Sequence, residues 1–328
     1  MKITLFLLTL AMLLCSSLVI SAQSLHYREA QEEFQKKEYL LAMLAAQKAV
    51  KVDDNNPAYH HLYGLILTEL KQYTEARAQL RKAIAQDPQN ADYHYALGAM
   101  LLREHREQPA ATPLPSMLKE QARTSREKAI AESLERAVQL DPDHLNARLA
   151  LGTFYHASKM SRLASQQFAA ITQKDPSFPG VHYHHAAVYL NSGRLPDALR
   201  ELKTEVELHP DDPSARLELG DLLLHTGSAK GALEQFLATE RTESALPDLY
   251  FGMAKAYRDL GQLERAIEAA RKCIELSPKL PASHALLGKL YDKKGDSKMA
   301  RKEMEIFERL QGEIAAELAA AYRSQNRK

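Results

Sequence analysis

A repeat period of about 34 residues governs most of this 328-residue sequence and limits what it can fold into. Segments such as RKAIAQDPQNADYHYALG, ERAVQLDPDHLNARLALG and RKCIELSPKLPASHALLG share one layout: an Ala- or Leu-rich run, a proline, and a new run that ends in Leu-Gly. The prolines Pro142, Pro176 and Pro210 are evenly spaced at this period, and Pro278 follows two periods later. A fixed period of this size is typical of stacked repeats, in which each unit contacts only its neighbours.

The composition favours helices throughout these repeats. Leu and Ala are abundant, whereas Val and Ile are scarce. Leu and Ala lose little side-chain entropy in a helix, and β-branched residues are the ones that strands favour. We therefore predict an all-α protein without a large sheet.

Small residues and prolines recur at fixed places in each copy, as in Tyr63-Gly64, Ala76, Ala83 and Pro88. The full set is Gly64, Ala76, Ala83, Pro88, Gly98, Pro142, Gly152, Pro176, Pro210, Gly220, Ala232, Ala266, Pro278 and Gly288. Closely packed helices need such small residues where their backbones are nearest. This pattern resembles the tetratricopeptide repeat (TPR) family. The resemblance implies a right-handed superhelical solenoid of about eight helix-turn-helix repeats with a C-terminal capping helix.

The N-terminal segment, 1–22, has the features of a signal peptide. Met1-Lys2 gives a positive start, an apolar run follows, and Ala22 supplies the small residue at which a signal peptidase cleaves. We predict export to the periplasm or secretion. The alternative is an anchor, because the length of Ile3–Ile20 is close to the lower limit of about 17 residues for a membrane helix. A lipoprotein is disfavoured, because the bulky Leu14 precedes Cys15.

The repeats also set the boundaries along the chain. We predict a degenerate first repeat over 23–56, a TPR solenoid over 57–314, and the end of a capping helix with a basic tail over 315–328. An insert near 104–123 interrupts the third copy and contains Pro109, Pro113 and Pro115. We predict a flexible loop there, which is either a partner-binding arm or a surface loop without a role.

No catalytic motif stands out against this background. The sequence lacks glycine-rich phosphate loops, nucleophile elbows and paired-cysteine clusters, so we predict no enzyme and no cofactor. The balance of 43 Lys+Arg against 42 Asp+Glu offers no general attraction to nucleic acid. Cys273 occupies a place that other copies fill with Ala, which predicts a small buried residue.

His182 and His185 are candidate metal ligands, because they lie at i and i+3 on one helix face. The repeat argues against this role. His182 occupies the place that often holds Trp in the family and that holds His60, His94, Tyr250 or His284 in other copies. We therefore predict packing roles and no metal site.

The resemblance implies that the first helices of successive copies line a concave groove that binds peptides or helices of other proteins. The groove-facing candidates are His61, Leu65, Tyr95, Leu149, Thr153, Tyr183, Leu217, Asp221, Phe251, Lys255, Arg258 and Lys289. Tyr and Leu in the middle and Lys and Arg towards the C-terminus suit a partner with an apolar stretch and an acidic end.

The predicted function is therefore a non-enzymatic scaffold or adaptor for protein–protein interaction. The alternative is a structural subunit of an envelope assembly or polysaccharide-export machine. Membrane contact is expected only through an N-terminus that is not cleaved. The sequence leaves the partner and the oligomeric state open.

Overall fold

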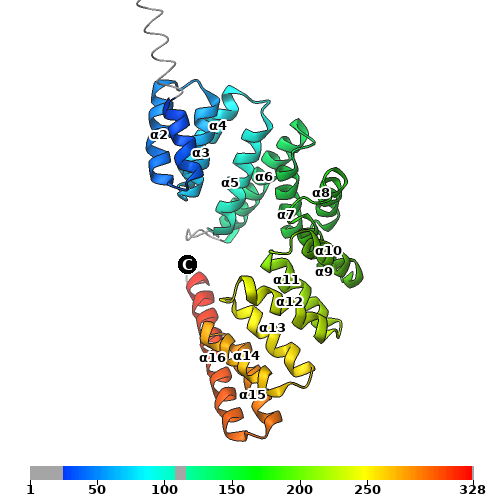
Figure 1. The fold of residues 1–328 in the computed structure, drawn as a ribbon. Coiled ribbons are helices and arrows are strands. Elements are labelled where there is room, and N and C mark those ends of the chain that lie inside the picture. Colours follow the sequence, from blue (N-terminus) through cyan, green and yellow to red (C-terminus); the bar gives the residue numbers. More distant parts are fainter. Residues whose placement is uncertain (1–24, 108–115, 327–328) are drawn as a thin grey trace, which may run out of the picture. The chain divides into compact units, whose positions relative to one another are not determined.

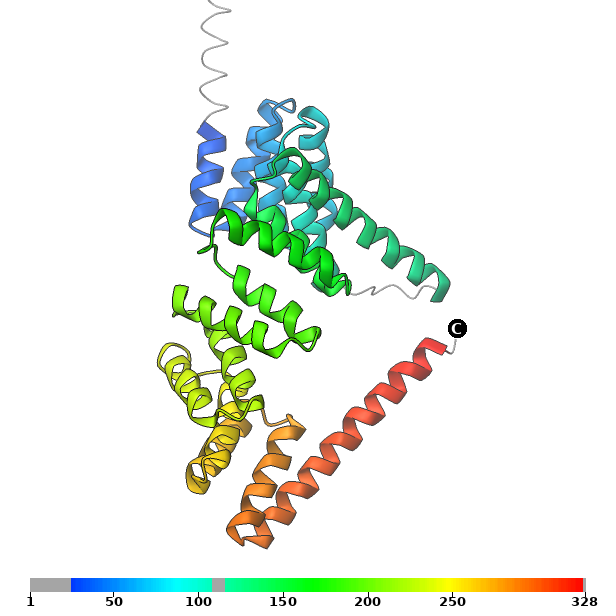
Figure 2. The same ribbon diagram turned by 90° about the vertical axis from the view of Figure 1, so that its right-hand side faces the viewer.

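The protein is an array of paired helices in the computed structural model, which describes residues 25–107 and 116–326 (Figures 1 and 2). Every regular element in these ranges is a helix, and within each unit most repeats consist of a first helix, a short turn and a second helix. The prediction of an all-α helix-turn-helix array ending in a capping helix is confirmed. The predicted signal peptide, 1–22, lies outside the described residues.

The chain divides into two compact units, Met1–Lys159 and Met160–Lys328. The described helices of the first unit are one over 25–35, α2 (Tyr39–Val52), α3 (Pro57–Glu69), α4 (Tyr73–Gln86), α5 (Ala91–Glu107), α6 (Ser116–Leu140) and α7 (Leu145–Ala157). Those of the second unit are α8 (Ser161–Lys174), α9 (Val181–Asn191), α10 (Leu195–Leu208), α11 (Pro213–His225), α12 (Ala229–Thr242), α13 (Pro247–Asp259), α14 (Leu263–Leu276), α15 (Pro281–Lys294) and α16 (Ser297–Asn326). None of these described helices is both long and apolar enough to cross a bilayer.

Local sequence explains where the helices begin and end. The Asp212 carboxylate accepts a hydrogen bond from the Ser214 backbone N–H (2.8 Å) at the start of α11, and Pro213 occupies the first turn. At the other end of a repeat, α4 stops at Gln86, with Asp87 as its C-cap and Pro88 directly after it. Proline disfavours helix in the preceding residue and so separates one helix pair from the next.

Close packing of the two helices in a pair depends on glycine. A Cβ atom built on Gly64 of α3 would lie 2.6 Å from the Cγ atom of Leu80 on α4. In the second unit, Gly220 and Gly252 both face the ring of Phe236, which is fully buried. Larger side chains at these glycines would force the helices apart, so the Leu-Gly signature reflects helix separation.

Both ends of the predicted insert are helical, although a loop was predicted there. Helix α5 continues to Glu107, and α6 begins at Ser116 rather than near Ser125. The stretch SMLKEQARTSREK lacks Gly and Pro and consists largely of good helix formers, so the second helix of this repeat extends towards its N-terminus. The remaining insert residues, 108–115, lie outside the described residues.

One position of the first helix connects most of the described repeats to the turn that precedes them; on α13 this position holds Tyr250, which donates to Glu240 instead. The Nε2 atoms of His60, His182 and His284 lie 2.9–3.0 Å from the carbonyl oxygen of the residue six places earlier. In α7 and α11 the same position holds arginine, and Arg148 Nε and Arg216 Nε each donate to such a carbonyl at 2.6 Å. A donor on a long side chain thus replaces the tryptophan that many TPR copies carry.

Candidate protein-binding surface

All twelve predicted groove residues lie on first helices, and each keeps part of its side chain accessible. Five belong to the first unit and seven to the second. The structure gathers four of them around one hollow in the second unit, and the others lie apart from it.

The hollow has a volume of about 380 Å³ and lies on the adjacent first helices α11 and α13. Its lining residues are Asp221, Leu224, His225, Asp248, Phe251, Lys255, Arg258 and Asp259. Asp221, Phe251, Lys255 and Arg258 were predicted from the sequence. We call this feature the first-helix hollow.

Charged groups inside the first-helix hollow pair with one another. Lys255 Nζ lies 3.6 Å from Asp221 Oδ1 and 5.4 Å from the centre of the Phe251 ring. Arg258 Nε donates to Asp259 Oδ1 at 2.8 Å. Partial desolvation raises the pKa of the Asp221 carboxyl above its usual range, and the Lys255 ammonium opposes that shift.

These pairs correct the predicted partner chemistry. Lys255 and Arg258 were expected to hold carboxylates of a partner, yet both already contact carboxylates of this chain. With Asp248 included, three carboxylates face two cations around the Phe251 ring. The hollow is therefore a site of mixed charge with an aromatic wall, and an acidic segment alone does not complement it.

The repeat period could have identified the Lys255–Asp221 pair, because residues one period apart occupy the same place on neighbouring first helices. One pair in the first unit follows the same rule. Arg103 Nη1 on α5 donates to Glu69 Oε1 on α3 (2.8 Å). Asp248 and Asp259 were missed because they lie in the first and last turns of α13, away from the predicted stripe.

The groove candidates of the first unit contact aromatic neighbours or their own helix. The rings of His61 and Tyr93 lie 4.8 Å apart, and those of Tyr95 and His144 lie 4.7 Å apart. Burial lowers the pKa of His61 and raises that of Tyr95. Leu65, Leu149 and Thr153 are half-buried, and Thr153 Oγ1 donates to the carbonyl of Ala150.

The other candidates of the second unit do not join the hollow. Tyr183 contacts His184 edge to face, with ring centres 5.3 Å apart. Leu217 packs against the core formed by α12 to α15, so it is partly structural. Lys289 on α15 is exposed and forms no ion pair within the described ranges.

Histidine and cysteine side chains are engaged in packing. His182 and His185 are buried, and His182 Nδ1 lies 2.7 Å from Glu201 Oε2. In the part of the chain that the structure describes, no three His, Cys, Asp or Glu side chains converge as metal ligands. Cys273 is fully buried, as predicted, and burial raises the pKa of its thiol.

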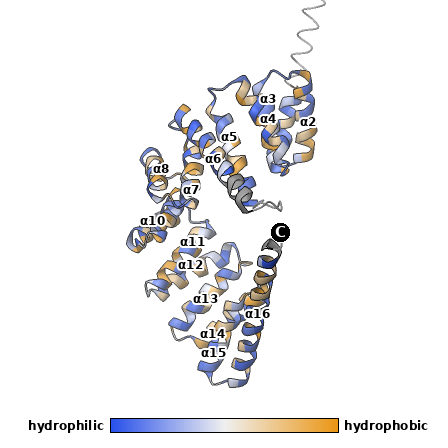
Figure 3. Ribbon diagram, turned by 180° about the vertical axis from the view of Figure 1, so that it is seen from behind, coloured by the Kyte–Doolittle hydropathy of each residue, from blue (hydrophilic) through white to orange (hydrophobic). Residues whose placement is uncertain are grey.

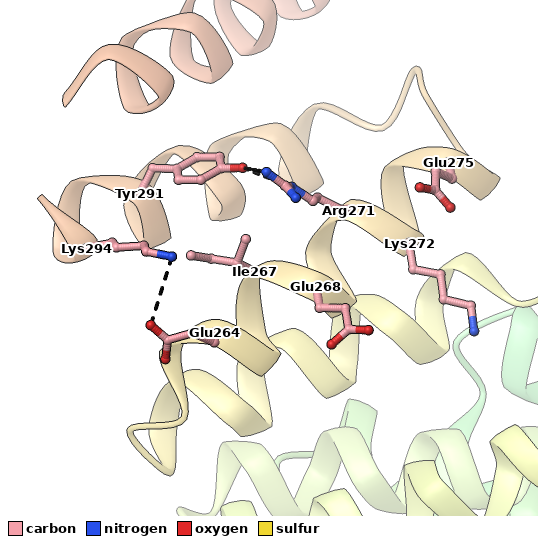
Figure 4. A pocket seen from close by; sticks show the side chains of 8 residues that line it. All are labelled: Glu264, Ile267, Glu268, Arg271, Lys272, Glu275, Tyr291 and Lys294. Atoms are coloured by element: carbon pink, nitrogen blue, oxygen red, sulfur yellow. Dashed lines mark hydrogen bonds and ion pairs between the residues drawn. The ribbon is translucent and has the colours of Figure 1, made fainter. Parts of the chain in front are cut away.

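A second hollow, of about 530 Å³, lies between α14 and α15 (Figure 4). Arg271 Nε donates to Tyr291 Oη at 2.9 Å, Lys294 Nζ lies 4.0 Å from Glu264 Oε1, and the buried Ile267 lies between these pairs. Most of its lining residues belong to the second helix α14, so this hollow is distinct from the first-helix surface.

Comparisons with known proteins agree with the repeat assignment. Residues 64–103 match a model described as TPR repeat, and residues 183–246 and 247–280 match tetratricopeptide repeat models. A TPR repeat-containing protein of Pseudomonas aeruginosa is 42% identical over 73 residues, covering 22% of this chain and 67% of that protein.

More distant relatives share parts of the chain or the fold alone. Anaphase-promoting complex subunit 3 of Dictyostelium discoideum is 25% identical over 89 residues, which is 27% of this chain and 9% of that protein. The present chain thus spans a small part of this relative. The solved structure of PilF from Pseudomonas aeruginosa aligns with a TM-score of 0.58 at 19% identity, covering 70% of this chain and 96% of that chain.

Proposed function

Because the chain belongs to the tetratricopeptide repeat family, we propose that it is a non-enzymatic scaffold or adaptor that binds a peptide or helix of another protein along its first helices. TPR proteins bind other proteins, and their repeats are typically non-catalytic. The observation that carries the proposal is the first-helix hollow, where α11 and α13 place an aromatic ring among charged groups.

The partner segment that fits this hollow has an apolar side chain flanked by charges of both signs. Phe251 offers a partly exposed ring on which an apolar or aromatic side chain packs. A partner carboxylate beside Lys255 and a partner cation beside Asp221 would replace the internal pair with two intermolecular pairs. The Phe251 ring would supply the apolar contact area, and the charges of Lys255 and Asp221 would fix the orientation of the bound segment.

Charge reversal inside and outside the hollow tests this function. Affinity purification with the Lys255→Glu, Arg258→Glu double variant is expected to lose the partner that the unaltered chain captures. Lys203→Glu, Lys230→Glu is the matched double control, because it reverses two exposed lysines on the second helices α10 and α12, outside the hollow. Circular dichroism verifies that the variants keep their helices.

A partner retained equally by all variants would contradict binding in the hollow. That outcome would favour the alternative, a structural subunit of an envelope assembly or polysaccharide-export machine, in which the array serves as a spacer.

We also propose that the protein is exported, on the basis of the apolar run and Ala22 near the N-terminus. Cell fractionation and sequencing of the mature N-terminus test this proposal. A mature chain that begins at Gln23 would support cleavage, whereas a retained Met1 in a membrane fraction would support the anchor.

A further inference from the structure

The helix α2 has an inverted distribution of apolar side chains. Its buried residues are all alanine: Ala42, Ala45, Ala46 and Ala49. Four of its larger apolar side chains face solvent: Leu40 is 64% exposed, Leu41 53%, Leu44 51% and Val52 40%. We call these four residues the α2 leucine face. Burial of leucine is favourable, so a helix that buries alanine and exposes leucine leaves apolar area for another surface to cover.

The repeat itself does not require leucine at these places. One period later, on α4, the same four positions hold Thr74, Glu75, Ala78 and Gln86, all of them exposed. On α12 they hold Lys230, Gly231, Glu234 and Thr242. As a set, the three leucines are therefore a local feature of the first repeat, whereas the place of Val52 is also apolar on α10 and α14, where it holds Leu208 and Leu276. Hydrophobic residues run along α2 in Figure 3.

The charged side chains of α2 itself are all positive. No Asp or Glu occurs within α2, and carboxylates stand only beyond its ends, at Glu38 and Asp53. Lys48 and Lys51 are exposed on α2, and Lys37 is exposed in the turn before it. These three lysines form no ion pair within the residues that the structure covers, so their ammonium groups are available to an anionic surface.

We propose that the α2 leucine face and its lysines dock on an anionic membrane surface. A helix with leucines on its outer side and lysines among them has the composition of an interfacial helix. The near-zero net charge of the chain does not oppose this docking, because the attraction acts within a Debye length and depends on nearby lysines.

The position of the face along the chain agrees with this occupant. The apolar run Ile3–Ile20 precedes Leu40 by a short stretch of sequence. If that run is kept as an anchor, it holds the first unit beside a bilayer. If it is cleaved after Ala22, docking rests on the α2 leucine face and its lysines alone. The leucine face belongs to the first unit and the first-helix hollow to the second, and they share no residue, so the docking proposed here does not rest on the proposed protein-binding function.

The absence of tryptophan allows a direct test on the full chain. Leu44→Trp places a single fluorophore on the face, and Ala78→Trp places one at the same repeat position of α4. The probe is vesicles of equal parts phosphatidylethanolamine and phosphatidylglycerol, compared with phosphatidylcholine vesicles. The emission of Leu44→Trp is expected to shift to shorter wavelength on the anionic vesicles only, while Ala78→Trp stays unshifted.

Neutralising the lysines separates the charge contribution from the apolar one. In the Leu44→Trp chain, Lys48→Gln and Lys51→Gln are each expected to raise the lipid concentration for half of the shift about five-fold.

Three results would overturn the proposal. An unshifted Leu44→Trp emission on chain that sediments with the vesicles would show that the face does not touch lipid. A shift without vesicles that grows with protein concentration would identify a second copy as the occupant. An equal shift on neutral vesicles, unchanged by the lysine substitutions, would exclude recognition of an anionic surface.

Discussion

Individual residues in the turns between paired helices show how one position favours glycine without requiring it. Gly193, Gly227, Gly261 and Gly295 all have positive φ angles, and Lys37, Lys71 and Lys159 adopt the same conformation at the equivalent turns. An L-residue with a side chain reaches this region only at a cost in free energy. The turn therefore depends on backbone conformation more than on contacts, since nothing lies within 4 Å of an added Cβ at Gly261.

Two glycine substitutions should have opposite effects on stability. Gly261→Ala is expected to lower the free energy of unfolding by about 1 kcal/mol, because alanine disfavours positive φ. Gly312→Ala, inside α16 with open space around it, is expected to raise that free energy by up to about 1 kcal/mol. Urea unfolding of both variants measures the difference, and a loss of equal size at both sites would refute the conformational explanation.

A buried alanine on α4 tests the close approach of paired helices. Ala76 is fully buried, so Ala76→Leu is expected to overpack the interface and cost about 1–3 kcal/mol. Ala78→Leu is the control, since Ala78 is exposed on the same helix. Thermal unfolding compares the two variants, and an unchanged melting temperature for Ala76→Leu would argue against this packing.

At the scale of helices, the side chain that replaces tryptophan links each first helix to its surroundings. Both ring nitrogens of His182 face acceptors, Glu201 Oε2 at 2.7 Å and the Pro176 carbonyl at 2.9 Å. Such an environment favours the imidazolium form. The hydrogen bond to Glu201 raises the pKa of His182, while burial opposes that shift. His185 and Arg200 also act on the Glu201 carboxylate, Arg194 acts on His185, and the Glu205 carboxylate adds to the raised pKa of His182.

The His182–Glu201 pair predicts a pH dependence with a definite sign. Because the folded pKa is raised above the unfolded value of about 6.5, the stabilisation is fully present below that pH and is lost as pH rises through the folded pKa. Glu201→Gln, which copies the His60–Gln79 arrangement of the second repeat, is expected to lower the pKa of His182.

Ring-proton NMR titration measures that pKa, and unfolding below and above it measures the stability difference. A His182 pKa unchanged by Glu201→Gln would contradict the ion-pair explanation.

The helices also show how far sequence predicts structure. The helix pairs, their boundary prolines and the capping helix follow from a short-range pattern that recurs once in every repeat. The start of α6 could not be predicted from that pattern. Three prolines suggested a loop, whereas the residues that follow them, from Ser116, favour helix. The ion pairs of Lys255 and Arg258 were missed because each groove residue was considered alone. Asp221 lies one period before Lys255 and Asp259 directly follows Arg258, so these neighbours could have been included.

At the scale of the molecule, the repeats leave little of the described chain outside helices, so function depends on what the helix surfaces present. The first-helix hollow offers an aromatic ring with mixed charge, and the α2 leucine face offers leucine with lysine. These surfaces differ in chemistry, which supports the assignment of a protein partner to one and a lipid surface to the other. The balanced overall charge leaves such local chemistry to select each partner.

Site-specific photo-crosslinking at Phe251 tests the central claim most directly. Replacing Phe251 with benzoylphenylalanine keeps an aromatic side chain in the hollow, and the same residue at the exposed Glu234 of α12 is the control. Irradiation in cells is predicted to give a discrete adduct with another protein from position 251 and none from position 234. The absence of an adduct at 251, or the same adduct from both positions, would contradict binding of a partner along the first helices.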